Sequence, residues 1–304
     1  MALRIGIDIG GTKANVGILG EDGSILAKRK LAVPANHGCA ATVLASAKTV
    51  HLLLQELGVT PADVTFCGIG VPGTVSEDGR TVRLAPNLGW KDEPCAVLFE
   101  ELTGIPATLV QDAKAAALGE YRQGAARGRK LALCVTLGTG IGAGIVWEGK
   151  LFHGALGGAG EVGHIPARPG GRLCGCGQRG CVETYSAGRG IAQTASEHPH
   201  WQGRAVTSEE VFAAAAAGDE VALGILREAV DLLGAALTSV VNVLSPDAVI
   251  FSGGMCSQRT LFVDPLIGYL RAHAYALSAD ERLLTAVAEL GEDAPMVGAA
   301  LLRG

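Results

Sequence analysis

The sequence contains one local pattern twice, and this repeat limits the folds open to the chain. A short apolar run (LRIGIDI) ends in the glycine turn 10–13, and two more strand-like runs follow it. The same order recurs at 131–153, where LALCVTL leads into the glycine turn 138–144 and then into two short apolar runs. The two turns begin 128 residues apart, at Gly10 and Gly138. A duplicated domain explains this spacing most simply, although two unrelated glycine-rich hairpins would look the same locally.

Strand-like and helix-like segments alternate along the rest of the chain. Further strands are expected at 64–70, 107–110, 248–251 and 283–288, with a hairpin at 75–84. Helices are expected from a cap at Asn36 to Gly58, from Pro94 to Gly104, from Gln111, after a capping box of Thr207 and Glu210, at 219–244, at 260–275 and from Pro295. This alternation predicts an α/β fold with largely buried sheets.

A second feature is the segment 161–183 (EVGHIPARPGGRLCGCGQRGCVE), which has few apolar side chains. Its ligand-type residues are His164, Cys174, Cys176 and Cys181, and three thiolates with one imidazole fill a closed tetrahedral zinc site. A metal would supply the order that such a segment lacks. Glu161 and Glu183 flank the four and are not needed as ligands, so both can face a small polar substrate.

The cysteine cluster is also compatible with chemistry besides zinc binding. Disulfides are disfavoured because three cysteines are an odd number and Cys174 and Cys176 are too close to pair comfortably. A redox site and a nucleic-acid-binding knuckle are the remaining alternatives. The five cysteines outside the cluster lie in apolar segments, as reduced core residues of a cytoplasmic protein would; they are Cys39, Cys67, Cys95, Cys134 and Cys256.

The bulk composition excludes several classes of protein. The chain of 304 residues is long enough for two domains, and 48% hydrophobic with 18% charged residues is typical of a compact soluble protein. A net charge of −5 without a long basic run argues against a nucleic-acid partner. The start of the chain leaves no room for a signal peptide, and no apolar stretch approaches the ~18–20 residues of a membrane span. We therefore expect a cytoplasmic protein with no membrane partner.

The two glycine turns are candidates for phosphate binding, because glycine lets backbone N–H groups approach a ligand closely. The turn 138–144 matches a dinucleotide fingerprint only superficially, since a strand rather than a helix follows it. Asp8, at the end of the first strand, is placed to hold Mg²⁺ through water while Thr12 or Lys13 meets phosphate oxygens. Ordinary tight turns remain the alternative.

Two further positions carry candidate chemistry. Asp112 stands where a strand ends and a helix begins, which favours either a helix cap or a base that accepts a proton from an attacking hydroxyl. In the loop 85–90, Asn87 is suited to binding a sugar hydroxyl, while Trp90 either stacks on a ligand or fills the core.

Taken together, these stretches resemble the ROK family of bacterial glucokinases, related sugar kinases and repressors, over essentially the whole chain. The motifs are GIDIGGTK at 6–13, APNLGW at 85–90, QDAKAAALGE at 111–120, LGTGIGAG at 137–144, GEVGH at 160–164, CGCGQRGCVE at 174–183 and SGG at 252–254. The resemblance implies an actin-like (ribonuclease H-like) duplicated two-domain α/β fold with an interdomain cleft. The domains would be 1–112 plus about 294–304, and 113–293 with the zinc loop.

The resemblance also implies roles for single residues. Asp112 would be the catalytic base. The sugar site would consist of Asn87, Gln111, Asp112, Glu161, His164 and Glu183. Structural Zn²⁺ would be held by His164, Cys174, Cys176 and Cys181, with the second ring nitrogen of His164 turned to a sugar hydroxyl. ATP and Mg²⁺ would be bound by Asp8, Gly10, Gly11, Thr12, Lys13, Gly138, Thr139 and Gly140, with Gly253 and Gly254 bordering the adenosine.

One motif departs from the family. Family kinases usually carry Asn-Asp-Ala-Asn where this chain has Gln111-Asp112-Ala113-Lys114, which leaves the hexose and the effect of Lys114 open. We expect ATP-dependent phosphorylation of an aldohexose, with glucose leading and allose, fructose, N-acetylmannosamine and N-acetylglucosamine as alternatives. A non-enzymatic sugar sensor is the competing function, disfavoured because no helix-turn-helix precedes Leu3. The resemblance further suggests a homodimer or homotetramer.

Overall fold

A computed structural model describes residues 2–33, 38–275 and 282–303 of the chain. Its strands are β1 (Leu3–Ile9), β2 (Lys13–Leu19), β3 (Ile25–Ala32), β4 (Val64–Val71), β5 (Thr74–Val75), β6 (Val82–Ala85), β7 (Trp90–Glu93), β8 (Ala107–Gln111), β9 (Leu131–Leu137), β10 (Ile141–Trp147), β11 (Lys150–Leu151), β12 (Ala248–Ser252) and β13 (Leu284–Val287). Its helices are α1 (Cys39–Leu57), α2 (Cys95–Thr103), α3 (Asp112–Gln123), α4 (Glu183–Ser186), α5 (Gly188–Glu197), α6 (Ser208–Ala216), α7 (Glu220–Leu244), α8 (Asp264–His273) and α9 (Ala294–Ala300).

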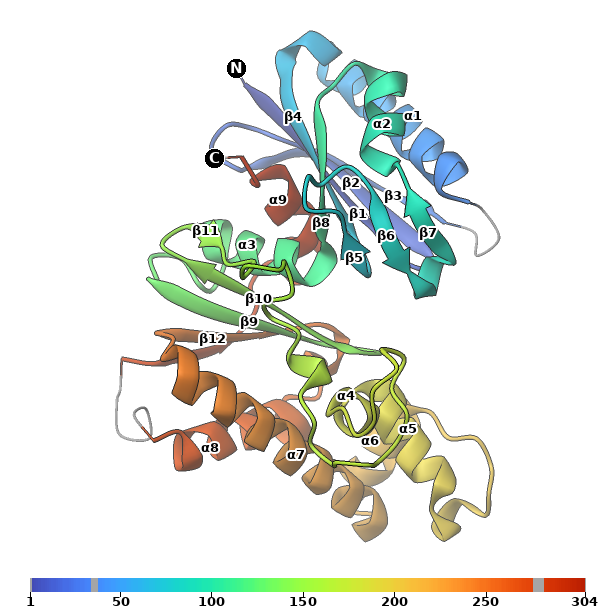
Figure 1. Cartoon of the computed structure of the whole chain (residues 1–304), viewed down its shortest axis with the longest axis vertical. Coiled ribbons are helices and arrows are strands. Elements are labelled where there is room, and N and C mark those ends of the chain that lie inside the picture. Colours follow the sequence, from blue (N-terminus) through green and yellow to red (C-terminus); the bar gives the residue numbers. More distant parts are fainter. Residues whose placement is uncertain (1, 34–37, 276–281, 304) are drawn as a thin grey trace. The chain divides into compact units, whose positions relative to one another are not determined.

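The two principal sheets have the same strand order, which confirms the duplication. The first sheet runs β3-β2-β1-β4-β8 and the second runs β11-β10-β9-β12-β13 (Figure 1). In the first, the hairpin strands β1, β2 and β3 pair antiparallel, and β1, β4 and β8 pair parallel. In the second, β9, β12 and β13 are parallel. A small third sheet, β5-β6-β7, completes the predicted α/β fold.

The chain packs into two compact units. One comprises residues 1–128, 144–157 and 289–304, and the other comprises 129–143 and 158–288. We refer to them as the N-terminal unit and the central unit. The predicted α/β domains, 1–112 plus about 294–304 and 113–293, stay a prediction.

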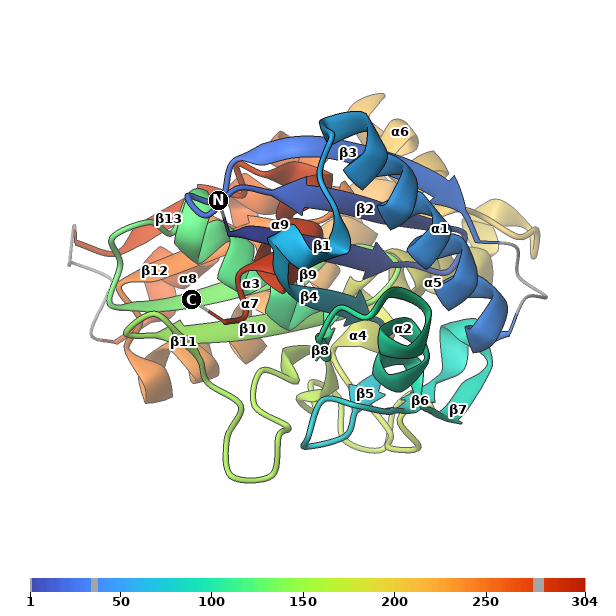
Figure 2. The same ribbon diagram turned by 90° about the horizontal axis from the view of Figure 1, so that it is seen from above.

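Helices cover both faces of the first sheet (Figures 1 and 2). Alternate residues of β1, among them Ile5 and Ile7, share one apolar core with the inner face of α1. On the other face α9 lies very close to the strands, because a methyl group at Gly6 would come within 1.9 Å of the carbonyl oxygen of Met296 and one at Gly68 within 1.8 Å of that of Ala299. Glycine at these two positions is what lets the C-terminal helix reach the sheet.

Most predicted elements are confirmed, and three were missed. The capping box is present: Glu210 N donates to Thr207 Oγ1 at 3.2 Å and Thr207 N donates to Glu210 Oε2 at 2.8 Å. The sequence did not predict β7, α4 or α5. β7 and α4 have only four residues each, and α5 begins with Gly-Arg-Gly, which disguises a helix whose buried residues Ile191 and Ala195 follow helical spacing. The expected cap Asn36 lies outside the described residues. Within the described ranges no helix combines the length and the apolar character needed to cross a bilayer.

Candidate functional site

The predicted site residues fall into two groups, one in each compact unit. The N-terminal unit holds Asp8, the turn 10–13, Asn87, Gln111 and Asp112, and the central unit holds the turn 138–140, Glu161, His164, the three cysteines, Glu183, Gly253 and Gly254. Each group is described within its own unit.

Strand register brings Asp8 and Asp112 to the same edge of the first sheet. Asp8 is paired with Gly70 across β1 and β4, and Gly70 is paired with Val110 across β4 and β8. Asp112 follows two residues later as the first residue of α3. Because adjacent strands are about 4.8 Å apart, the two backbones lie roughly 10 Å apart at the carboxyl edge of parallel strands, where α/β proteins bind ligands.

The two carboxyl groups affect each other electrostatically. Desolvation, then the negative charge of Asp112, raises the pKa of Asp8 from 3.8 to about 7, against the opposing effect of Lys13. A carboxyl group in this environment gains from a nearby cation. The environment of Asp8 therefore fits the predicted Mg²⁺ role.

Asp112 does not have the local role that competed with catalysis. The residue at the helix cap is Gln111, which makes no side-chain cap hydrogen bond. Asp112 stands in the first turn of α3, where its Oδ1 accepts a hydrogen bond from Ala113 N at 2.7 Å. The positive end of a helix dipole favours a carboxylate there.

The glycine turn 10–13 lies beside the loop that carries Asn87. Gly10 N donates to Lys13 O at 2.8 Å, and a methyl group at Gly11 would lie 4.0 Å from the carbonyl oxygen of Asn87. Asn87 is exposed, whereas Trp90 is only 3% exposed. Trp90 therefore fills the core, and the side chain of Asn87 is accessible to solvent.

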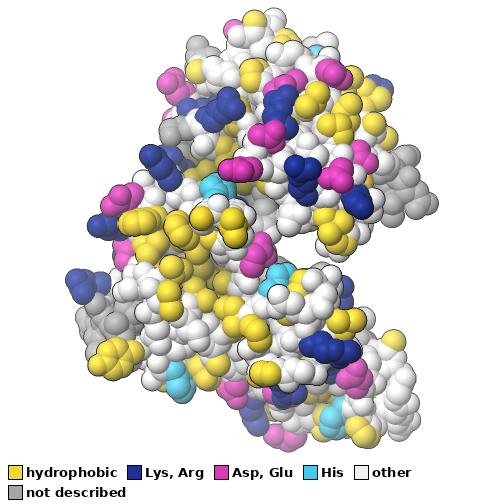
Figure 3. Space-filling model, in the orientation of Figure 1, with side chains coloured by type: hydrophobic (Ala, Val, Ile, Leu, Met, Phe, Trp, Pro, Cys, Tyr) yellow, Lys and Arg dark blue, Asp and Glu magenta, His cyan; other side chains and the backbone are white. Residues whose placement is uncertain are grey.

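Lys13 is exposed and forms an ion pair with Glu292. Its Nζ lies 3.4 Å from Glu292 Oε2, and Lys30 also pairs with Glu292. Figure 3 shows Lys, Arg, Asp and Glu side chains interspersed on the visible face rather than gathered by sign. Exposed pairs of this kind contribute little to stability, so Glu292 holds Lys13 only weakly.

In the central unit, the backbone of Ile141, the first residue of β10, contacts both Glu183 and the turn that carries His164. Ile141 N donates to Glu183 Oε2 at 2.8 Å. A methyl group at Gly163 would lie 2.2 Å from the carbonyl oxygen of Ile141, so the turn that carries His164 packs directly on the same residue. One carboxylate oxygen of Glu183 thus has a backbone partner, which fixes the direction of this side chain.

The predicted nucleotide-binding turns of this unit, 138–140 and 253–254, also lie close together. Gly138 N donates to Gly140 O at 3.0 Å and closes the turn after β9. Gly253 has φ of 93° and a methyl group there would lie 2.3 Å from the carbonyl oxygen of Leu137, so only glycine fits this left-handed backbone against the end of β9. The structure therefore places Gly253 next to the 138–140 turn.

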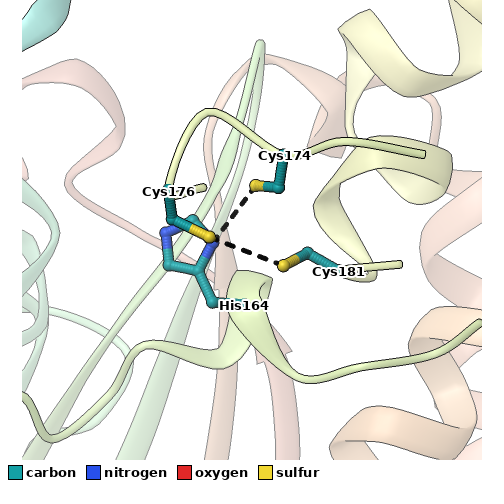
Figure 4. Close-up of side chains that lie close together, drawn as sticks. All are labelled: His164, Cys174, Cys176 and Cys181. Carbon is teal, nitrogen blue, oxygen red and sulfur yellow. Dashed lines mark hydrogen bonds between the residues drawn. The ribbon is translucent and has the colours of Figure 1, made fainter. Parts of the chain in front are cut away.

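The four predicted metal ligands form one cluster (Figure 4). Their ligand atoms all lie within 4.8 Å of one another. Cys176 Sγ is 3.7 Å from Cys181 Sγ, and Cys174 Sγ is 3.6 Å from His164 Nδ1. A tetrahedron with zinc–ligand bonds of about 2.3 Å to sulfur and about 2.0–2.1 Å to nitrogen has S–S edges of about 3.8 Å and S–N edges of about 3.6 Å. The donor atoms therefore fit zinc in both type and spacing.

The geometry also assigns the two ring nitrogens of His164. Nδ1 faces the cysteine sulfurs, while Nε2 lies 4.0 Å from Glu161 Oε2. A metal on Nδ1 would fix the ring and leave Nε2 directed toward the carboxylate. Desolvation raises the pKa of Cys174, and it is the first cause that raises the pKa of Cys181 to about 12, so metal binding has to displace thiol protons.

The cysteine segment has internal support besides any metal. Cys174 N donates to Gln178 O at 2.8 Å, and Arg172 N donates to Tyr185 Oη at 2.8 Å. The guanidinium groups of Arg168 and Arg172 each lie 4.9 Å from the centroid of the Tyr185 ring. Cation–π contacts with partly buried rings contribute about 0.5–2 kcal/mol each, so the segment is held by more contacts than its composition predicted.

Comparison with known proteins identifies the family to which the chain belongs. A family model described as "ROK family" matches residues 4–303. The chain belongs to the ROK family. The family membership predicted from the motifs is therefore confirmed.

Named relatives within this ROK group include sugar kinases. The chain is 34% identical to a glucokinase of Streptomyces coelicolor, with 99% of this chain and 97% of the relative covered. It is 33% identical to an N-acetylmannosamine kinase of Citrobacter koseri, with 98% and 97% covered. Among solved structures it resembles a ROK family glucokinase from Streptomyces griseus in complex with glucose and AMPPNP, with a TM-score of 0.80, 35% identity and 99% of each chain covered. These likenesses confirm the predicted α/β fold.

Two residues of this ROK protein take roles that the sequence did not indicate. Ile141 is an ordinary strand residue by sequence, yet its backbone anchors both Glu183 and the turn of His164. Lys114 was an unexplained departure from the motif, and it proves to be buried at 6% exposure. No local pattern reports either role, because both depend on segments distant in sequence.

Proposed function

We propose that this protein is an ATP-dependent hexose kinase that transfers a phosphoryl group to the 6-hydroxyl of an aldohexose, with glucose as the leading substrate. The observation that carries the proposal is the position of Asp112, at the carboxyl edge of the parallel strands and within electrostatic range of Asp8. The likeness over nearly the full chain to glucokinases, one of them solved with glucose and AMPPNP, supports the same activity.

The chemistry requires one base and well-placed positive charge. Asp112 accepts the proton of the sugar hydroxyl, the hydroxyl oxygen forms a bond to the γ-phosphorus of ATP, and the bond to the β–γ bridging oxygen breaks to release ADP. Mg²⁺, when bound near Asp8, neutralises phosphate charge. The N–H groups of the turns 10–13 and 138–140, together with Lys13, orient the phosphates, and Gly253 and Gly254 border the adenosine.

The sugar contacts are assigned to the six residues predicted from the sequence. Asn87, Gln111, Asp112, Glu161, His164 and Glu183 would bind the hexose. Zn²⁺, when bound by His164, Cys174, Cys176 and Cys181, supplies a rigid link between the cysteine segment and the His164 ring. His164 Nε2 and Glu161 then present a donor and an acceptor to sugar hydroxyls.

N-acetylmannosamine is the second substrate candidate. A 33% identical relative carries that kinase activity in its name, and Gln111 departs from the family asparagine at a sugar-contact position. A longer amide at 111 would change the room available on one side of the hexose. The other sugars considered from the sequence are allose, fructose and N-acetylglucosamine.

A substrate panel tests the proposal. Purified protein is incubated with Mg-ATP and each of these sugars while ADP release is followed, and Asp112→Asn is measured in parallel. We expect turnover with one or more aldohexoses and a loss of at least about 10²-fold in Asp112→Asn, because a positioned base contributes this much. Asp22→Asn, a change at an exposed aspartate that lies outside every site motif, is the control. Absence of turnover on every sugar, or equal rates for wild type and Asp112→Asn, would refute the proposal.

Three further properties belong to the same proposal. The functional domains are 1–112 with about 294–304, and 113–293. The protein acts in the cytoplasm, which is consistent with eight cysteines that form no disulfide among the described residues. It assembles as a homodimer or homotetramer, which size-exclusion chromatography with light scattering measures directly.

A further inference from the structure

Lys114 is a buried lysine, which is rare in folded proteins unless the ammonium group has a partner. It is the third residue of α3 and is 6% exposed. Its Nζ donates to the carbonyl oxygen of Gly157 at 2.6 Å, within the N-terminal unit. Hydrogen bonds from charged donors are shorter and stronger than neutral ones, so this contact is a firm link between α3 and the segment around Gly157.

The segment that receives this bond has little other support. Residues 152–158 are all exposed, and Leu156 is 98% exposed. Gly154 and Gly157 both have positive φ, at 70° and 76°, and the hydrogen bond from Gly157 N to Gly154 O is long at 3.4 Å. A glycine-rich, exposed segment loses much conformational entropy on ordering, so one strong hydrogen bond has a large effect on its order.

The anchored segment leads directly to the sugar-site residues. Glu161 follows Gly157 by four residues, a reach of at most about 14 Å for an extended chain. Lys114 also has an electrostatic effect near the other end of the segment. The pKa of His153 is lowered by desolvation and then by the positive charge of Lys114. Residues two apart on a helix point to different sides, so Lys114 and Asp112 leave α3 in different directions.

We propose that Lys114 is a positioning residue for sugar binding: its ammonium group holds the Gly157 carbonyl and thereby fixes the 152–160 segment that presents Glu161. The proposal rests on the proposed hexose kinase function. It assigns a role to the position where the chain departs from the family motif.

The test compares Lys114→Met, which keeps the length of the aliphatic part of the side chain and removes the ammonium group, with Lys48→Met, the same change at an exposed lysine on α1. Steady-state kinetics give KM for the best hexose, KM for ATP and kcat, and hydrogen–deuterium exchange reports on peptides covering 152–160. For Lys114→Met we expect the hexose KM to rise about tenfold or more, with kcat and the ATP KM within about twofold. The 152–160 amides should exchange faster. Lys48→Met should match the wild type in all four measurements.

The outcomes separate the two proposals. An unchanged hexose KM, a loss confined to kcat, or unchanged exchange in 152–160 would overturn the role of Lys114. Should Lys114→Met fail to fold, Lys114→Gln, which removes the charge but keeps a polar end, is measured in the same way and judged by the same criteria. A wild-type protein with no turnover would refute the hexose kinase function, and the exchange data would still decide whether Lys114 holds the segment.

Discussion

Replacing Asp8 by asparagine is expected to stabilise the protein at neutral and alkaline pH. The pKa of Asp8 is raised from 3.8 to about 7, first by desolvation and then by the charge of Asp112. Between these pH values the folded protein keeps a proton that the unfolded chain has released, so wild-type stability falls as the pH rises from about 4 to about 7. Asparagine has nearly the same shape and no charge, and it removes this cost.

The magnitude follows from the size of the pKa change. A rise from 3.8 to about 7 corresponds to a ceiling of about 4 kcal/mol above pH 7. Solvent access to the partly exposed carboxyl group lowers this figure, and removing Asp8 also removes its attraction to Lys13. We therefore expect Asp8→Asn to be more stable than wild type by at least about 1 kcal/mol at pH 8, a rise in Tm of roughly 2 °C for a chain of this size.

Thermal unfolding at pH 5, 6.5 and 8 measures the effect. The buffer should lack magnesium but contain no chelator, because a chelator would also remove zinc. The gain in Asp8→Asn should grow from pH 5 to pH 8, and Mg-ATP should stabilise the wild type more than the variant. Asp22→Asn is the matched control with the opposite sign, because hydrogen bonds from Ser24 lower the pKa of Asp22; this variant should gain no stability at pH 8.

A second variant checks the cause. Asp112→Asn removes the charge that is the second contributor to the raised pKa of Asp8. The loss of stability with rising pH should therefore begin near pH 4, as in the wild type, but end at a lower pH and be smaller in total. If Asp8→Asn is less stable than wild type at pH 8, or if the difference between them does not change with pH, the electrostatic reasoning is wrong.

The remaining predictions concern the metal and two structural contacts. Chelation that removes zinc, verified by elemental analysis, should lower Tm and hexose affinity together, and an unchanged Tm would refute the metal's role in ordering the cysteine segment. Glu120→Gln should lower the free energy of unfolding by about 1–3 kcal/mol. The side chain of Glu120 is fully buried and accepts hydrogen bonds from Ala125 N at 2.9 Å, Glu289 N at 3.0 Å and Leu290 N at 2.8 Å. Glu56→Gln, at an exposed position, is the control and should change the free energy of unfolding by less than about 1 kcal/mol. Thr207→Ala should cost about 1 kcal/mol through loss of the helix cap, and equal urea midpoints for variant and wild type would contradict this.

The α/β class, the duplication and the cluster of ligand-type side chains could be predicted from the sequence because each is encoded locally. Strands and glycine turns follow from short apolar runs and the residues that end them, as in LRIGIDI before Gly10. The cluster of His164 and three cysteines is recognisable because zinc ligands of these types lie close together along the chain. The position of Asp112 after β8 followed from the change of pattern between strand and helix.

Tertiary structure decided which residues meet. Sequence could not show that Lys114 turns to Gly157, that Glu183 binds the backbone of Ile141, or that Nδ1 rather than Nε2 of His164 faces the sulfurs. It also could not show that Trp90 fills the core. These outcomes depend on packing between segments far apart in the chain, where close contact and desolvation select one partner among many that local propensity leaves equal.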